Sequence, residues 1–172
     1  MSETVKPVIN LADVALSHVN ARDTGDGRGF SAMIGSFGDR IGSTGIGCML
    51  HVVQPGEKAF PFHNHHQCHE LFVMLEGEGT YRFGKERFPI KAGDVCAAPT
   101  GGPEVAHQII NTGSTVLKYL GLSTMAGTEV VEYPDSGKFA VSSRFNWATM
   151  SGGVRHVGRV GEHCLDYYEG EE

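Results

Sequence analysis

The chain has 172 residues, of which 40% are hydrophobic and 20% are charged, a composition suited to one globular domain with a single core. Its 14 Lys and Arg are outnumbered by 20 Asp and Glu, giving a net charge of -6, and the basic residues are scattered, which argues against a nucleic-acid partner. No secretory signal opens the sequence and no run approaches the ~20 apolar residues of a membrane span, so we expect no membrane partner and a cytoplasmic location.

The predicted elements begin with an N-terminal arm, residues 1–34, which contains the loop-like run RDTGDGRG and a brief helical pattern at residues 10–20. Residues 35–123 then hold short apolar segments rich in Val, Ile, Phe and Tyr, which are bounded by Gly, Pro or Asn and recur about every 8–12 residues. These segments are GIGCMLHVV, ELFVMLEG, GTYRFG, RFPIKAGDVCAAP, EVAHQIIN and TVLKYLGLS. Residues 124–172 lose this regularity and form a predicted C-terminal extension. The pattern indicates an all-β sandwich or barrel flanked by two arms.

The segment FPFHNHHQCHE, residues 60–70, gathers four of the nine histidines of the chain. Alternate side chains of a strand share a face, so His63 and His65 can meet one metal ion together. Glu70 begins the next apolar strand and can return to that ion, and His107, far downstream, can supply a third imidazole. Three nitrogens and one carboxylate suit a divalent transition metal. The alternative is a solvated, histidine-rich loop.

Two blocks of sequence surround these candidates. From Gly56 to Gly77 the chain reads G-x6-HxH-x4-E-x6-G, and from Gly93 to Asn111 it reads G-x5-PxG-x5-H-x3-N. The blocks resemble the paired motifs of the cupin superfamily, and the resemblance covers roughly residues 45–122. The first block has one residue more than is usual before its first histidine, and the second has three more than is usual before its own.

The resemblance implies a double-stranded β-helix, or jelly roll, that holds one divalent ion, zinc, manganese, iron or nickel, inside the barrel mouth. The implied metal ligands are His63, His65, Glu70 and His107. Strand alternation turns His66 and His69 away from the ion, and the remaining histidines are expected to be unrelated to it: His18, His51, His156 and His163. Phe72 and Met74 lie on the same strand face as Glu70 and are expected to line the barrel interior.

The wider pattern is similar to small single-domain bacterial cupins, some of which are labelled sugar-phosphate isomerase-like. It implies a metal-dependent enzyme of the isomerase or dioxygenase type, in which an open metal position polarises an oxygen of a small polar substrate. The alternative is a non-catalytic protein that binds a small molecule through the metal. The catalytic residues stay unassigned, and the candidates for a general base are Glu78, Glu104, Tyr81 and His69.

Two further expectations concern association and thiols. A small jelly roll exposes sheet edges, and the two arms are long enough to cross onto a partner, which together predict a homodimer. The four cysteines lack any CxxC spacing and are predicted to be free thiols. None has a sequence context that would lower its pKa, so we expect no cysteine nucleophile.

Overall fold

The computed structural model describes residues 5–21, 29–145, 151–159, 161 and 164–171. Its strands are β1 (Ser17–Ala21), β2 (Phe30–Ser36), β3 (Ile46–Val53), β4 (Asn64–His65), β5 (Glu70–Glu76), β6 (Glu78–Phe83), β7 (Glu86–Lys91), β8 (Val95–Ala98), β9 (His107–Ile110), β10 (Leu117–Thr124), β11 (Thr128–Tyr133), β12 (Lys138–Ser143) and β13 (Val154–Arg159). The described residues contain no α-helix, and hence no helix able to cross a bilayer, so the all-β prediction is confirmed.

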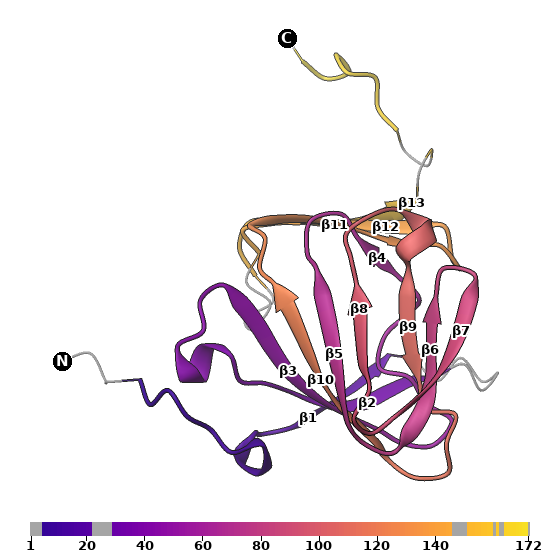
Figure 1. Ribbon diagram of the computed structural model, residues 1–172. Helices are drawn as coiled ribbons and strands as arrows, with labels where there is room; N and C mark the ends of the chain where they lie inside the picture. Colours follow the sequence, from indigo (N-terminus) through magenta and orange to yellow (C-terminus); the bar gives the residue numbers. More distant parts are fainter. Residues whose placement is uncertain (1–4, 22–28, 146–150, 160, 162–163, 172) are drawn as a thin grey trace.

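The strands form three antiparallel sheets. A six-stranded sheet has the order β1-β2-β3-β10-β5-β8, a three-stranded sheet has the order β7-β6-β9, and a four-stranded sheet has the order β13-β12-β11-β4. Side chains from the first two sheets pack into one buried cluster, so these sheets face each other as the walls of a barrel (Figure 1). The non-consecutive strand order is that of a double-stranded β-helix, as predicted.

The barrel interior is filled by alternate residues of its strands. On β5, Phe72 is 8% exposed and Met74 is 1% exposed, and both point inward with Glu70 as predicted. Gly77, with φ at 79°, makes the turn that leaves β5 for β6. A Cβ at this position would collide with the carbonyl oxygen of Val116, so glycine is required both for its backbone conformation and for the close approach.

The N-terminal segment differs from the prediction. Instead of a helix over residues 10–20, a 3-10 turn, η1 (Leu11–Asp13), is followed by β1. The side chain of Asn10 caps this turn by accepting the backbone N–H of Ala12 at 2.9 Å. Val14, which follows the turn, is buried in a small cluster on the outside of the six-stranded sheet. Pairing with β2 and burial of Val14 therefore override a weak local helical pattern.

Strands from both predicted arms join the barrel. β2 crosses the predicted boundary at residue 34 and pairs with β3, while β11 pairs with the two-residue strand β4, matching His65 with Val131 and Asn64 with Glu132. Figure 1 shows β11, β12 and β13 lying across one end of the barrel. The C-terminal sheet consequently covers the end at which the histidine-rich segment lies.

Candidate metal centre

Four side chains predicted from the sequence converge at the covered end of the barrel. His65 lies on β4, Glu70 starts β5 and His107 starts β9. His63 precedes β4 and forms an isolated bridge with His107: the N–H of His107 donates to the carbonyl of His63 at 2.7 Å, and the N–H of His63 donates in return at 3.1 Å. Backbone pairing therefore brings the two blocks of sequence side by side.

The three imidazoles face one carboxylate oxygen. The Nε2 atoms of His107, His65 and His63 lie 2.9, 3.3 and 3.8 Å from Oε2 of Glu70. In the tightest group, formed by His63, Glu70 and His107, all ligand atoms lie within 4.8 Å of one another. The His65 ring lies between Glu70 and a second carboxylate, Glu129, whose Oε2 is 3.5 Å from Nδ1 of His65.

The hydrogen bonding of His63 fits a bound cation. Its Nδ1 lies 2.8 Å from the carbonyl oxygen of Pro61, which can only accept, so Nδ1 carries the proton. Burial first, and then the charges of His107 and His65, lower the pKa of His63 to about 4, so that its ring is neutral at pH 7. The lone pair on Nε2 thus faces the carboxylate of Glu70, also an acceptor, and a shared cation would satisfy both groups.

The charges of the site support the same conclusion. Burial alone would raise the pKa of Glu70, but hydrogen bonds from His107 and His65, together with the charges of the histidines, lower it well below its ordinary value. Burial would also lower the pKa of His65, yet its contacts with Glu70 and Glu129 raise it. The site thus contains an ionised carboxylate among imidazoles, a donor set that suits a borderline divalent ion.

Aromatic side chains lie on two sides of the group. The ring centroids of Phe72 and Tyr81 lie 5.6 and 6.3 Å from that of His107. On the side nearer the solvent, the rings of Phe60 and Tyr133 lie 6.4 and 6.3 Å from that of His63.

The other histidines near the cluster lie outside this group, as predicted. His66 and His69 are exposed, and Nε2 of His66 lies 3.2 Å from the carboxylate of Glu132. His51 lies inside the barrel on β3, where its ring stacks on Tyr119 with centroids 4.5 Å apart and planes at 8°. Burial lowers the pKa of His51 to about 4, so this ring is neutral at pH 7.

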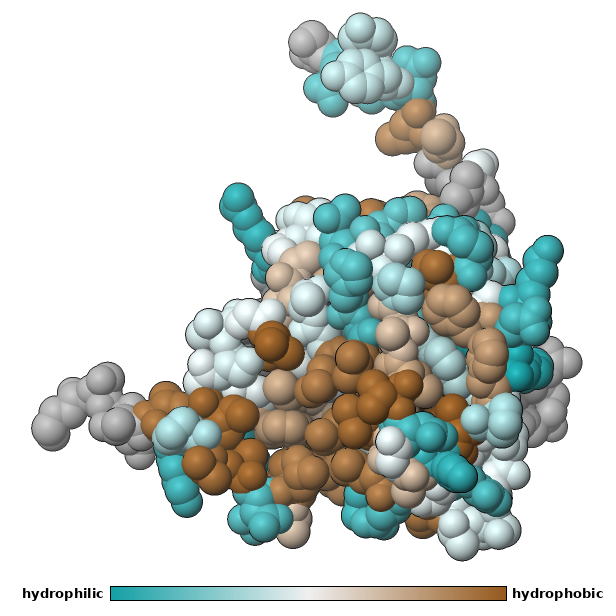
Figure 2. Space-filling model, in the orientation of Figure 1, coloured by the Kyte–Doolittle hydropathy of each residue, from teal (hydrophilic) through white to brown (hydrophobic). Residues whose placement is uncertain are grey.

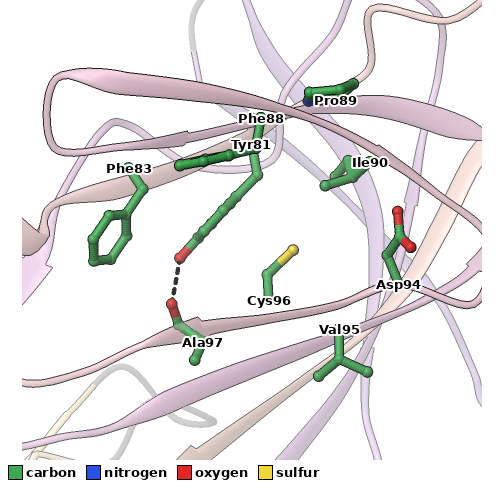
Figure 3. A pocket seen from close by; sticks show the side chains of 9 residues that line it. All are labelled: Tyr81, Phe83, Phe88, Pro89, Ile90, Asp94, Val95, Cys96 and Ala97. Carbon is green, nitrogen blue, oxygen red and sulfur yellow. Dashed lines mark hydrogen bonds between the residues drawn. The ribbon is translucent and has the colours of Figure 1, made fainter.

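The four base candidates do not approach the group with a free basic atom. The hydroxyl of Tyr81 donates to the carbonyl of Ala97 at 2.9 Å, and burial raises its pKa (Figure 3). The carboxylate of Glu104 accepts the N–H of Gly102 at 3.0 Å. The remaining two candidates, Glu78 and His69, are exposed.

A cavity of about 470 Å³ lies on the other side of Tyr81, between the β6–β7 hairpin and β8. Its lining residues are Tyr81, Phe83, Phe88, Pro89, Ile90, Asp94, Val95, Cys96 and Ala97. Figure 3 shows the Cys96 thiol among these mainly apolar side chains; burial, and then the charge of Asp94, raise its pKa to about 11. The cavity contains none of the candidate ligands and no activated thiol.

Sequence reasoning missed Glu129 and Tyr133, which lie on β11 within the predicted C-terminal extension. Both contact candidate ligands, Glu129 at His65 and Tyr133 at His63. The alternation in TEVVEY places these two residues on one strand face and so offers a weak signal. The alternation does not indicate which strand that face contacts.

Comparisons with known proteins agree with this geometry. Residues 49–123 match the family described as the cupin domain. An oxalate-binding protein of Thermotoga maritima is 37% identical over 68 residues, a match that spans 40% of this chain and only 54% of that protein.

Two solved structures resemble almost the whole chain. A putative sugar phosphate isomerase from Acidithiobacillus ferrooxidans has a TM-score of 0.75 at 23% identity, covering 93% of this chain and 96% of its own. A sugar phosphate isomerase of the cupin superfamily from Silicibacter pomeroyi has a TM-score of 0.72 at 23% identity, covering 94% and 98%. Such identities establish the fold alone. Residues 49–123 thus match the cupin-domain family, and the jelly-roll strand order and the paired histidine motifs agree with that match.

Proposed function

We propose that the chain holds one divalent transition metal ion through His63, His65, Glu70 and His107 and acts on a small polar molecule at that ion. The observation that carries the proposal is the convergence of three Nε2 atoms on one carboxylate oxygen, at 2.9 to 3.8 Å. The ion is zinc, manganese, iron or nickel, since mixed imidazole and carboxylate donors suit all four.

An ion that accepts five or six ligands would keep a position for a substrate oxygen beside these four side chains. When bound, the ion would supply Lewis-acid polarisation of a carbonyl or enediol oxygen. The chain itself contributes a neutral His63, whose proton stays on Nδ1, and an ionised Glu70. The buried rings of Phe72 and Tyr81 pack beside that of His107.

Turnover is our first hypothesis, as an isomerase or a dioxygenase, because an ion with an open position could polarise the substrate oxygen in either reaction. Binding without turnover is the second. It is favoured by a specific observation: Tyr81 and Glu104 are engaged by backbone groups and do not offer a free base. The curated relative named an oxalate-binding protein points to a small carboxylate anion as a ligand for this chain.

Metal analysis of freshly purified protein tests the ligand set. We expect one equivalent per chain, and we expect His63→Ala and His107→Ala to lose most of it while circular dichroism still reports a β fold. His69→Ala, an exposed neighbour in the same segment, is the matched control and should keep the metal. Folded His63→Ala and His107→Ala proteins with a full equivalent would contradict the assignment.

Glu70→Gln tests the carboxylate ligand separately from the fold. The substitution keeps the shape of the side chain but removes its charge, so we expect metal affinity to fall at least tenfold, or by ~1.4 kcal/mol. The thermal midpoint of the metal-free protein should change less than that of the metal-loaded one. An unchanged affinity measured by competition with a chelator would exclude Glu70 as a ligand.

A substrate screen separates the two activities. Sugar phosphates, small keto acids and diketones would be tested with iron, manganese and zinc, each with and without oxygen. Oxygen-independent rearrangement indicates an isomerase, and oxygen consumption indicates a dioxygenase. If no combination gives turnover, while calorimetry shows oxalate binding only to metal-loaded protein, the binding hypothesis prevails.

A further inference from the structure

One buried carboxylate outside the proposed ligand set is directed at the loop of residues 66–68, which joins the HxH motif to β5. Glu129, on β11, is 8% exposed. Its Oε1 accepts the backbone N–H groups of His66 and Gln67, each at 3.0 Å, and its Oε2 accepts that of Cys68 at 2.8 Å. Three consecutive backbone amides thus donate to one carboxylate. These hydrogen bonds fix the path of the loop between His65 and Glu70.

This buried carboxylate accepts backbone N–H groups from two parts of the chain, the loop of residues 66–68 and its own strand. Its Oε1 also accepts the N–H of Val130 at 2.8 Å. Main-chain donors therefore occupy both oxygens, which suits an anchoring group and not a metal ligand.

The same carboxylate faces the back of the His65 ring. Oε2 of Glu129 lies 3.5 Å from Nδ1 of His65, whose Nε2 lies 3.3 Å from Glu70 on the opposite side. This Nδ1 is buried and has no hydrogen-bond partner among the described residues, and the Glu129 carboxylate is the acceptor that faces it. When a cation takes the lone pair of Nε2, the ring proton has to lie on Nδ1, where the carboxylate of Glu129 faces it. His63 reaches the same state through the carbonyl of Pro61.

We infer that Glu129 is a positioning residue of the metal centre, which orients His65 and sets its tautomer without touching the ion. The inference rests on the proposed function, because it requires His65 to be a ligand. It also gives the C-terminal sheet a defined part in the site: β11 supplies the group that orders a ligand carried by its partner strand β4.

Cobalt titration tests this role, because Co2+ reports its ligand field in visible absorption whether or not the protein is active. We expect Glu129→Gln to weaken Co2+ binding about 10- to 100-fold and to alter the absorption spectrum. Glu129→Asp keeps the charge and should recover part of the affinity. The matched control is Glu132→Gln on the same strand, which contacts Asn64 and His66 but none of the four proposed ligands, and should bind Co2+ as the unaltered protein does.

A double-mutant cycle separates orientation of His65 from general support of the loop. If Glu129 acts through His65, the loss caused by Glu129→Gln largely disappears when His65→Ala is already present. An equal loss in both backgrounds, or an unchanged affinity and spectrum in Glu129→Gln, overturns the inference and leaves the proposed function standing. Failure of the unaltered protein to bind Co2+ overturns both. If the Glu129→Gln protein does not fold, the same cycle is measured with Glu129→Asp.

Discussion

Burial determines the charge of His51, a side chain on β3 that is 3% exposed. Its ring lies between Tyr119, stacked at 4.5 Å, and Phe60, whose ring meets it edge-on at 5.7 Å. Because desolvation disfavours the charged form, the pKa of His51 falls to about 4, below its ordinary value of 6.5. Between about pH 4 and pH 6.5, His51 therefore binds a proton more readily in the unfolded chain than in the folded protein.

This difference predicts acid destabilisation. Between pH 6.5 and about pH 4 the unfolded state binds more protons at His51 than the folded state does, so the free energy of unfolding falls as pH decreases. The full effect of His51 is on the order of 3 kcal/mol. His63 acts in the same direction, so urea unfolding at several pH values should be compared with His51→Phe, which keeps a ring without titrating. A pH dependence as steep in the variant as in the unaltered protein would refute the prediction.

Cys68 illustrates the opposite case, a thiol inside the histidine cluster that is not reactive. Burial, and then its hydrogen bond to Glu129, raise the pKa of Cys68 to about 11, so little thiolate exists at neutral pH. We expect Cys68→Ser, whose hydroxyl can still donate to Glu129, to leave metal content and unfolding midpoint nearly unchanged. Loss of metal or activity in this variant would indicate a chemical role for the sulfur.

At the scale of the elements, β3 and β10 approach closely where Gly121 faces His51. A Cβ added at Gly121 would lie 2.9 Å from Cε1 of His51, whose ring is packed against those of Tyr119 and Phe60. We therefore expect Gly121→Ala to destabilise the protein by about 1–3 kcal/mol in urea unfolding. Gly45→Ala is the control, because nothing lies within 4 Å of a Cβ at that position. Equal midpoints for the two variants would show that the His51 ring can move aside at little cost.

The strands of the barrel were largely predictable, because each buries one face against a common core. The apolar run from Glu70 to Glu76 and the run from Leu117 to Thr124 are bounded by turn residues, and both form long central strands. The strands β11 to β13 were not predicted individually. Most residues of β12 are only half-buried, so its sequence lacks the sharp alternation that marks a strand with one buried face.

The candidate site, like the fold, was predictable only in part. The spacing of His63 and His65 is local, and strand alternation alone places them on one side. Glu129 could not be found by such reasoning, because its position depends on a pairing of only two residues between β11 and β4. A pairing of two residues that are far apart in the sequence produces no periodic pattern in either segment.

At the scale of the whole molecule, the outer face of the six-stranded sheet is apolar. Its uncovered part, the outer apolar face, consists of Ile46, Leu71, Val73, Val95 and Leu122. Figure 2 shows hydrophobic side chains gathered over this region of the molecule. Residues such as Leu11 and Val14 cover the neighbouring part of the sheet, so the N-terminal segment covers only part of its apolar surface.

We propose that two copies associate through the outer apolar face, which keeps the homodimer expected from the sequence as a prediction. Exposed apolar patches of this kind often mark interfaces. Leu71→Glu or Val95→Glu should shift the mass in light scattering toward that of one 18.5 kDa chain. Val154→Glu is the control, since Val154 is 60% exposed, as Val95 is, but lies on β13. A monomeric unaltered protein at micromolar concentration would exclude the dimer.

The bidentate ion pair between Arg82 and Asp135, at 2.6 and 2.8 Å, fastens the turn after β11 to β6, with the guanidinium over the ring of Phe62. This attachment has a consequence for the order of events during synthesis. All four proposed ligands leave the ribosome before residue 128. A nascent chain of that length lacks β11, which pairs with β4 and whose Glu129 accepts three amides of the loop at residues 66–68. If Glu129 positions His65 as inferred, full affinity for a metal ion would come only after the C-terminal hairpin has docked on the barrel.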